Sequence, residues 1–186
     1  MSEPSFVLET GRLGLRRYRP DDLDDLWAIQ RDADTMAYYP HPFSREESAA
    51  WIERNLRRYD VDGFGLLAII EKGTGTFLGN CGPVVQHVEG VDEIELGWLV
   101  RRDRWREDIA TEAALGCRDH YGEVLRIRRF ISLVRPENRA SRRVAEKIGM
   151  SIDREIAWGG EAWPHLVYAT GEIKANARAR GRRRSP

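Results

Sequence analysis

Cysteine and histidine are scarce in this sequence. Two cysteines, Cys81 and Cys117, and four histidines occur among 186 residues. The cysteines form no CxxC pair and the histidines form no HxH or HxxxH pair, so neither a disulfide scaffold nor a metal site built from these residues is indicated. We therefore expect both cysteines to be buried, reduced thiols, and we expect the protein to work without a metal ion.

Long apolar runs and an excess of one charge are also missing. No segment approaches the roughly 18–20 apolar residues that a membrane-spanning helix needs, and the first residues carry neither a basic region nor an apolar signal core. The 30 basic residues balance 30 acidic ones, which argues against a general binder of nucleic acids. We expect a cytoplasmic protein that does not associate with membranes.

The charge is uneven only near the end of the chain. Five arginines fall between Arg178 and Arg184. Such a run could contact RNA or an acidic partner, but it is more often a solvated tail. We expect residues 175–186 to form a disordered, arginine-rich tail. Residues 1–174 suit a single domain, because this length supports one well-buried core.

Hydrophobic periodicity predicts the helices and strands of this domain. Asp21 or Asp22 is the expected N-cap of a first helix. A capping box at residues 44–47 opens a second helix, and Gly149 ends the last one. The expected strands are 13–18, 65–71, 76–86, 91–100, 127–134, 151–157 and 165–170, and the expected helices begin near residues 20, 44, 109 and 138.

The order of these elements indicates the fold class. The turn at residues 72–75 joins two strands as an antiparallel hairpin. Strands 91–100 and 127–134 flank a helix, so they should run parallel. The sequence therefore predicts an α+β protein, with a central twisted mixed sheet flanked by helices.

The stretch from Trp98 to Tyr121 joins an apolar strand to a helix through a charged turn. Ala113, Cys117 and Tyr121 recur at helical spacing, so one face of the helix should pack on the sheet. Free N–H groups at the start of such a helix form a natural anion site. Considered by itself, the stretch fits an ordinary strand–turn–helix connection at least as well.

Motifs on both sides of this stretch carry a resemblance to a known family. Residues 95–100 read ELGWLV, residues 105–113 read WREDIATEA, and residues 135–150 read RPENRASRRVAEKIGM. With LETGRL at 8–13 and RPDD at 19–22, they resemble the GNAT superfamily of acyl-CoA N-acyltransferases, within it the ribosomal-protein N-terminal (alpha-amine) acetyltransferase-like branch. The resemblance implies acetyl transfer from acetyl-CoA to a primary amine, by direct attack in a ternary complex.

The resemblance also implies where acetyl-CoA would bind. The strand that ends at Val100 would hold the pantetheine through exposed backbone groups, and the turn and helix start after Trp105 would hold the pyrophosphate through N–H groups. Asn138 would contact the pantetheine amide, cap its helix, or do both. The cofactor-binding residues expected on this basis are Trp98, Leu99, Val100, Trp105, Arg106, Glu107, Asp108, Ile109, Ala110, Thr111, Asn138 and Ser141.

For catalysis, the resemblance implies Glu95 as the base and Glu93 as the second choice, and either could instead be a structural glutamate. A carboxylate of ordinary pKa, ~4.3, would act through water or only hold the amine. A backbone N–H near Trp98 is the expected oxyanion donor. Many relatives carry a tyrosine acid where this sequence has Ala145. Ser141 is therefore the expected proton donor, unless its hydroxyl only bonds locally to the helix backbone.

The pyrophosphate turn departs from the family pattern at Arg106 and Asp108, where close relatives have glycine. Asp108 places a negative charge beside two phosphates, and this repulsion predicts a loss of affinity of roughly tenfold or more. Two hypotheses follow. The protein is an active acetyltransferase with a modified loop, or it is a catalytically impaired binding or scaffold protein with the same fold.

The sequence leaves the acceptor amine open. The expected substrate-binding residues are the aromatic side chains of Tyr38, Tyr39, Phe43 and Trp158. The segment from 38 to 43 could instead be a hydrophobic staple for the helix that follows it. Amino acids, polyamines, aminoglycosides and peptides all present amines, and a peptide or protein α-amine is the first expectation. We expect a monomer or a homodimer.

Overall fold

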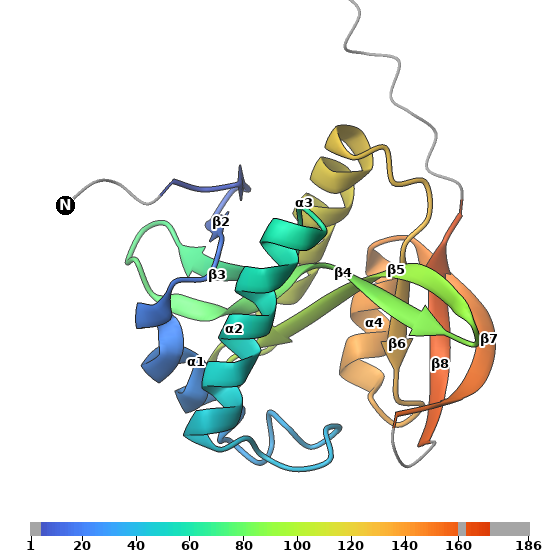
Figure 1. Cartoon of the computed structure of the whole chain (residues 1–186), viewed down its shortest axis with the longest axis horizontal. Helices are drawn as coiled ribbons and strands as arrows, with labels where there is room; N and C mark the ends of the chain where they lie inside the picture. The colour runs from blue at the N-terminus through green and yellow to red at the C-terminus, as the bar shows by residue number, and fades with distance from the viewer. Residues whose placement is uncertain (1–4, 160–162, 172–186) are drawn as a thin grey trace, which may run out of the picture.

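The computed structural model describes residues 5–159 and 163–171. The predicted tail and the predicted domain end at residue 174 lie outside the described residues. The described residues form one sheet in the order β1-β2-β3-β4-β5-β6-β8-β7 (Figure 1). The strands are β1 (Leu8–Glu9), β2 (Leu13–Arg16), β3 (Leu67–Glu71), β4 (Phe77–Val88), β5 (Val91–Val100), β6 (Ile131–Val134), β7 (Met150–Trp158) and β8 (Trp163–Thr170). The helices are α1 (Leu23–Gln30), α2 (Arg45–Val61), α3 (Ile109–Val124) and α4 (Arg139–Lys147), with 3-10 turns η1 (Pro20–Asp22) and η2 (Arg102–Arg104).

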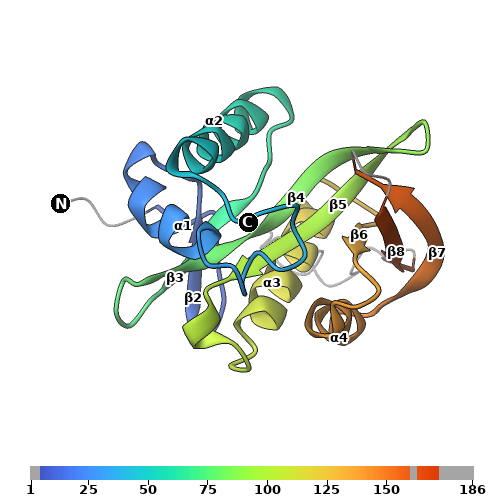
Figure 2. The same ribbon diagram turned by 90° about the horizontal axis from the view of Figure 1, so that it is seen from below.

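Helices cover both faces of this sheet. Figure 2 shows α1 and α2 on one face and α3 and α4 on the other. The central strands are therefore apolar on both sides, and Ile69 and Leu78 are fully buried. Neighbouring strands are antiparallel except for β5 and β6, which run parallel as predicted. The predicted α+β fold is confirmed.

The strand predictions hold best where apolar residues alternate over a long run. β5 spans the predicted residues, and β3 and β4 form the predicted hairpin. β6 is shorter than the predicted strand 127–134, because its ladder with β8 begins only at Ile131, opposite Ala169. Arg129 lies outside that ladder and bonds to Asp153 (3.0 Å).

Asp22 is the N-cap residue of α1, as predicted, and a 3-10 turn precedes the helix. The Asp22 side chain makes no capping bond to the helix. The Asp22 carboxylate instead accepts two hydrogen bonds from the Arg16 guanidinium (2.8 and 2.6 Å) and one from Arg19 N (2.7 Å). Both members of the ion pair are buried. The predicted first strand 13–18 accordingly ends at Arg16, and the short strand β1 beside it was not predicted.

Asp22→Ala is expected to lower the free energy of unfolding by about 3–5 kcal/mol, because it leaves a buried guanidinium unpaired. Urea denaturation measures the loss. Asp24→Ala is the matched control, since its exposed carboxylate pairs with Arg45 on the surface (2.7 Å) and should contribute less than about 1 kcal/mol. Equal losses in the two variants would contradict this assignment.

Helix starts and thiols follow their predictions closely. Ser44 and Glu47 form the predicted capping box of α2, and Gly149 has the left-handed φ of 80° expected after α4. Cys81 and Cys117 are buried free thiols, as predicted, and burial raises the pKa of Cys81. In the part of the chain that the structure describes, no helix combines the length and apolarity needed to cross a membrane.

Candidate active site

A cleft of about 1320 Å³ opens along β5, between β6, the start of α3 and α4. In the described chain, the ladder between β5 and β6 consists of the single pair Glu95 and Ile131, so the two strands separate beyond it. A pocket for one small ligand is typically about 300–1,000 Å³. This cleft is therefore large enough for two substrates side by side.

The edge of β5 presents free backbone groups to the cleft. Leu96 O accepts from Ser132 Oγ on the β6 side (2.7 Å), whereas Arg101 N donates to β4 (2.9 Å). Because alternate residues of a strand turn their backbone groups to opposite edges, the N–H groups of Trp98 and Val100 point toward the gap between β5 and β6. Such an edge can bind an extended chain of amides.

The turn before α3 has the backbone shape of an anion site. The first helical bond runs from Glu112 N to Asp108 O (2.9 Å), so the N–H groups of residues 109–111 have no acceptor within the helix. Arg106 and Asp108 have left-handed φ angles of 70° and 59°, which glycine adopts most readily. The loop therefore keeps the conformation that a glycine-containing loop would have, with larger side chains at both positions.

The Asp108 carboxylate is not a free charge. The Lys147 ammonium of α4 bonds to it and holds the pKa of Asp108 below its usual range. The ion pair offsets part of the repulsion that the sequence predicts between Asp108 and phosphate. Glu107, expected among the cofactor-binding residues, does not line the cleft. Its carboxylate pairs with Arg104 (2.9 Å) instead.

Helix α4 contributes cations that the sequence analysis missed. Arg139, Arg143 and Lys147 follow one another at four-residue spacing, which places them on one helical face. All three line the cleft, as does Arg106 from the turn. The four-residue spacing of these basic residues in the sequence could have revealed that they share one face of the helix. These cations make the end of the cleft near α3 suitable for phosphate groups.

Glu95 lies on β5 in the wall of the cleft. Its carboxylate accepts from Gln86 Nε2 (2.7 Å) and from Leu133 N (3.4 Å). Burial raises the pKa of Glu95 above its usual range, although the two hydrogen bonds lower it. The expectation of an ordinary pKa is therefore wrong, and a raised pKa makes the carboxylate a better proton acceptor. Glu93 is bound by Arg154 (2.7 Å) outside the cleft.

Asn138 and Ser141 lie at the start of α4, opposite β5. Asn138 Oδ1 accepts from Ser141 N (3.0 Å), which confirms the predicted N-cap. Ser141 Oγ accepts from Trp98 Nε1 (3.0 Å) across the cleft. This bond uses the oxygen as acceptor and leaves the hydroxyl proton available for donation. Among the described residues, no backbone carbonyl accepts from this hydroxyl.

Aromatic side chains line the other end of the cleft. The structure places Tyr38, Tyr39 and Trp158 in this lining, and burial raises the pKa of Tyr39 to about 12. Phe43 lies outside the cleft, because its ring packs on Tyr39 (5.9 Å between centroids) and Trp51 (5.8 Å). Phe43 is therefore part of the aromatic packing beside α2. It does not form the hydrophobic staple considered above, because the fourth residue of α2 is Ser48.

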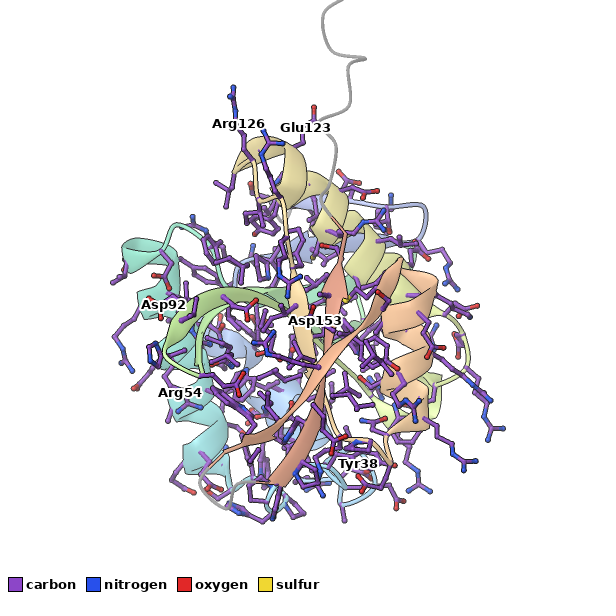
Figure 3. The ribbon with its side chains drawn as sticks, turned by 90° about the vertical axis from the view of Figure 1, so that its right-hand side faces the viewer. Tyr38, Arg54, Asp92, Glu123, Arg126 and Asp153 are labelled. Atoms are coloured by element: carbon purple, nitrogen blue, oxygen red, sulfur yellow. The ribbon has the colours of Figure 1, made fainter. Side chains whose placement is uncertain are left out.

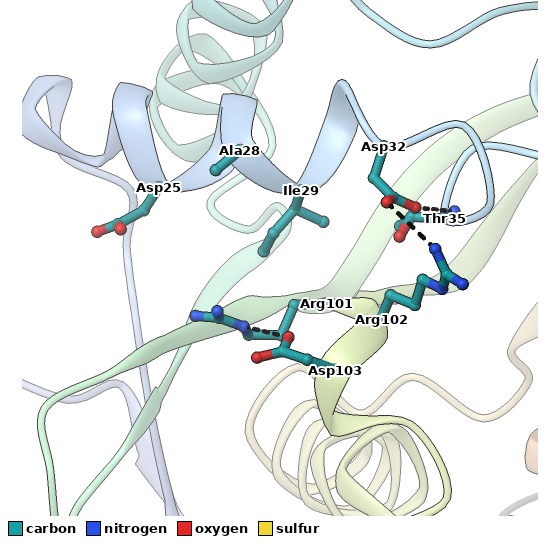
Figure 4. Close-up of a pocket in the computed structure, with 8 residues that line it drawn as sticks. All are labelled: Asp25, Ala28, Ile29, Asp32, Thr35, Arg101, Arg102 and Asp103. Carbon is teal, nitrogen blue, oxygen red and sulfur yellow. Dashed lines mark hydrogen bonds and ion pairs between the residues drawn. The ribbon is translucent and has the colours of Figure 1, made fainter.

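A second, smaller hollow lies between α1 and η2, with a volume of about 520 Å³ (Figure 4). Four of its charged side chains form ion pairs, as Arg101 pairs with Asp103 (2.6 Å) and Arg102 contacts Asp32 (3.8 Å). Asp25 is the remaining charged side chain of the lining. The large cleft, which also contains the strand edge and the start of α3, is the candidate active site. Over residues 5–159 and 163–171, no group of three His, Cys, Asp or Glu side chains is placed to hold a metal ion.

Comparisons with known proteins agree with this geometry. Residues 12–151 match the acetyltransferase (GNAT) domain family. The chain belongs to this family. YkkB, an uncharacterized protein of Bacillus subtilis, is 35% identical over 150 residues, which are 80% of this chain and 87% of YkkB. The crystal structure of an acetyltransferase from Agrobacterium tumefaciens matches with a TM-score of 0.76 and 28% identity, covering 92% of this chain and 96% of that one.

Structural neighbours of this GNAT domain include RimL, a ribosomal alpha-N-protein acetyltransferase solved in complex with coenzyme A. The TM-score is 0.71 at 16% identity, with 90% of this chain and 98% of RimL covered. At that identity the likeness concerns the fold alone. Together, the family and its solved members support an N-acetyltransferase and give no support to the non-catalytic alternative.

Proposed function

We propose that this GNAT domain transfers the acetyl group of acetyl-CoA to a primary amine, by direct attack of the amine within a ternary complex. The acceptor amine belongs to a peptide or protein N-terminus or to a small molecule. The observation that carries the proposal is the position of Glu95. This carboxylate of raised pKa lies in one cleft with a free strand edge and with an aromatic pocket.

The residues of the cleft fit acetyl-CoA, whose bound form supplies the acetyl group as a thioester. The N–H groups of residues 109–111, with Arg106, Arg139 and Arg143, would hold the phosphates. The free edge of β5 would hold the pantetheine amides. The N–H groups and cations match the phosphates of acetyl-CoA, and the β5 edge matches its pantetheine amides. This correspondence supports the proposal.

Three groups of the chain would then act on the reacting atoms. Glu95 would accept a proton from the amine, directly or through water, as the C–N bond forms. The Trp98 N–H would donate to the carbonyl oxygen as negative charge develops on it. Ser141 would pass its hydroxyl proton to the departing thiolate as the C–S bond breaks and take a proton from solvent water in the same step, so that no alkoxide remains. A thiol has an ordinary pKa of ~8.5, so this donation helps without being essential.

Turnover of acetyl-CoA tests the proposal. The purified chain is incubated with acetyl-CoA and a panel of peptides, amino acids, polyamines and aminoglycosides, and free thiol is measured together with the mass of the amine. Acetylated amine and free thiol in equal amounts are expected. If acetyl-CoA binds but no amine in the panel is acetylated above the uncatalysed rate, the domain is a binding module and the proposal fails.

Ser141→Ala is expected to lower kcat by roughly tenfold, because proton donation to the leaving thiolate is lost, whereas loss of the bond from Trp98 Nε1 should change the KM for acetyl-CoA little. The helix cap persists, since Ser141 N, not its hydroxyl, binds Asn138. Ser141→Thr keeps a hydroxyl and should retain most of the activity. An unchanged kcat in Ser141→Ala would reduce Ser141 to a hydrogen-bond partner of Trp98.

A further inference from the structure

The acceptor end of the cleft is rich in positive charge. Arg54 and Arg58 of α2 line it with Arg135, which follows β6 and contacts Glu137 (3.7 Å) (Arg54 and Tyr38 are labelled in Figure 3). The carboxylates among the described lining residues are Asp34, Glu95 and Asp108. Asp34 pairs with Arg102 (2.5 Å) and Asp108 with Lys147. Glu95 is thus the one described carboxylate of the lining without an ion pair.

Arg54 and Arg58 carry like charges on the same helix, and neither has a carboxylate partner among the described residues. They stand four residues apart on one helical face, an arrangement that is unfavourable for like charges. No carboxylate of residues 5–159 or 163–171 lies within ion-pair distance of either guanidinium. Burial, followed by the charges of Arg58 and Arg57, lowers the pKa of Arg54. An anionic ligand would relieve this repulsion.

The two arginines have different neighbours in the cleft. The Arg54 guanidinium lies over the Trp51 ring, 5.5 Å from its centroid, and such stacking limits its movement. Arg58 lines the same cleft as Glu95, and its positive charge lowers the pKa of that carboxylate. A molecule that fills this part of the cleft can therefore present its amine to Glu95 and an anionic group to the guanidinium groups.

Building on the proposed acetyl transfer, we propose that the acceptor amine belongs to a molecule that also carries an anionic group, a carboxylate or a phosphate, which Arg54 and Arg58 bind while the amine lies at Glu95. Guanidinium groups bind such oxyanions through paired, charge-assisted hydrogen bonds. Polyamines and aminoglycosides are disfavoured, because their additional cations would meet the same arginines. Amino acids, acidic peptides and phosphorylated amines have the required chemistry.

Matched pairs of acceptors test this specificity. The values of kcat/KM are compared for glycine and glycinamide, for alanyl-glutamate and alanyl-glutamine, and for O-phosphoethanolamine and ethanolamine, with spermidine as the cationic acceptor. At least one anionic member is expected to exceed its neutral partner by about tenfold or more, which corresponds to one additional charge-assisted contact. The second and third pairs distinguish a carboxylate from a phosphate.

Variants of α2 test whether Arg54 and Arg58 cause the preference for anionic acceptors. Arg54→Gln and Arg58→Gln are each expected to raise the KM for the preferred anionic acceptor by about tenfold, with an unchanged KM for acetyl-CoA. Arg57→Gln is the matched control, because it removes the same charge from the same helix outside the cleft lining. Its acceptor KM should stay within about twofold of the wild type, since exposed charges distant from the ligand are screened.

The outcomes separate the two proposals. This inference is overturned if neutral amines or spermidine are acetylated at least as fast as anionic amines. That result leaves the proposed acetyl transfer unaffected. A preference for anionic acceptors that survives in both Arg54→Gln and Arg58→Gln also overturns it. No acetylation of any amine, despite acetyl-CoA binding, overturns the proposed function and this inference with it.

Discussion

Glu95→Gln is expected to lower kcat by about 100-fold or more and to leave the affinity for acetyl-CoA unchanged. The expected loss is that of a general base, because the amide cannot accept the proton of the amine. The exchange is nearly isosteric: the amide oxygen can accept from Leu133 N, and the Gln86 amide can turn over so that its oxygen accepts from the new NH2 group. Stopped assays of thiol release with a preferred amine measure kcat, and equilibrium dialysis measures the affinity for acetyl-CoA.

Glu93→Gln is the matched control on the same strand. Its carboxylate binds Arg154 and Arg129 outside the cleft, so kcat should stay within about twofold of the wild type, as for residues remote from the reacting atoms. If Glu93→Gln loses as much activity as Glu95→Gln, the loss reflects damage to β5, and the assignment of the base is wrong.

The pH dependence of the same pair of proteins gives a second readout. In the wild type, kcat/KM should rise with pH through the pKa of Glu95, which burial raises, because the ionised carboxylate is the active form. Glu95→Gln should lack this part of the profile. A profile in which both proteins rise with the same midpoint would assign that ionisation to the amine or to another group.

Stability should change in the opposite direction to activity. The folded state raises the pKa of Glu95, so it binds this proton more tightly than the unfolded chain, whose glutamate has a pKa of ~4.3. The stability that the proton contributes is complete below the unfolded pKa and is lost as the pH rises through the folded pKa. The Tm of Glu95→Gln relative to the wild type should therefore increase as the pH rises from about 4 through the folded pKa of Glu95.

Asp108→Gly is expected to tighten the binding of acetyl-CoA by about tenfold or more. The substitution removes a negative charge beside the phosphates, frees the Lys147 ammonium to bind them, and suits the left-handed φ of 59° at this position. Equilibrium dialysis with acetyl-CoA measures the change. Weaker binding in Asp108→Gly would mean that Asp108 orders the turn through Lys147 rather than opposing the phosphates.

Arg106→Gly separates charge from backbone strain. Arg106 shares the left-handed conformation, with a φ of 70°, but carries the opposite charge. If the charge decides affinity, Asp108→Gly binds acetyl-CoA more tightly and Arg106→Gly binds it more weakly. If strain in the turn decides, both glycine variants bind more tightly. Lys147→Ala should weaken binding in both backgrounds, because it leaves Asp108 unpaired in the wild type and removes a cation that can bind the phosphates in Asp108→Gly.

Features that local sequence determines were predictable. The alternation in β5, the capping box at Ser44 and the N-cap at Asn138 depend on residues close together in the chain, and the structure has all three. The general position of the cleft was also predictable, because the resemblance covers both strands that border it. Arg106 and Asp108 could be singled out from the resemblance, although their conformation could not.

Features that depend on register and distant contacts were not predictable. The hydrogen bond from Gln86 to Glu95 requires the register between β4 and β5, so the raised pKa of Glu95 could not be derived from the sequence. The pair between Lys147 and Asp108 joins two helices. The sequence predicted Asp22 as a possible N-cap of α1 but not its buried ion pair with Arg16, which takes the carboxylate that a side-chain cap would have used.

The measurement that tests the central claim most directly is isothermal titration of acetyl-CoA into the wild-type chain, with Asp108→Gly titrated alongside. The proposed function predicts saturable binding of one acetyl-CoA per chain, at micromolar to submillimolar concentrations, because the turn, the α4 cations and the β5 edge together form its site. No heat from the wild type at about millimolar acetyl-CoA, with normal binding by Asp108→Gly, would mean that Asp108 has closed the site. The wild-type chain would then not be an acetyl-CoA-dependent enzyme.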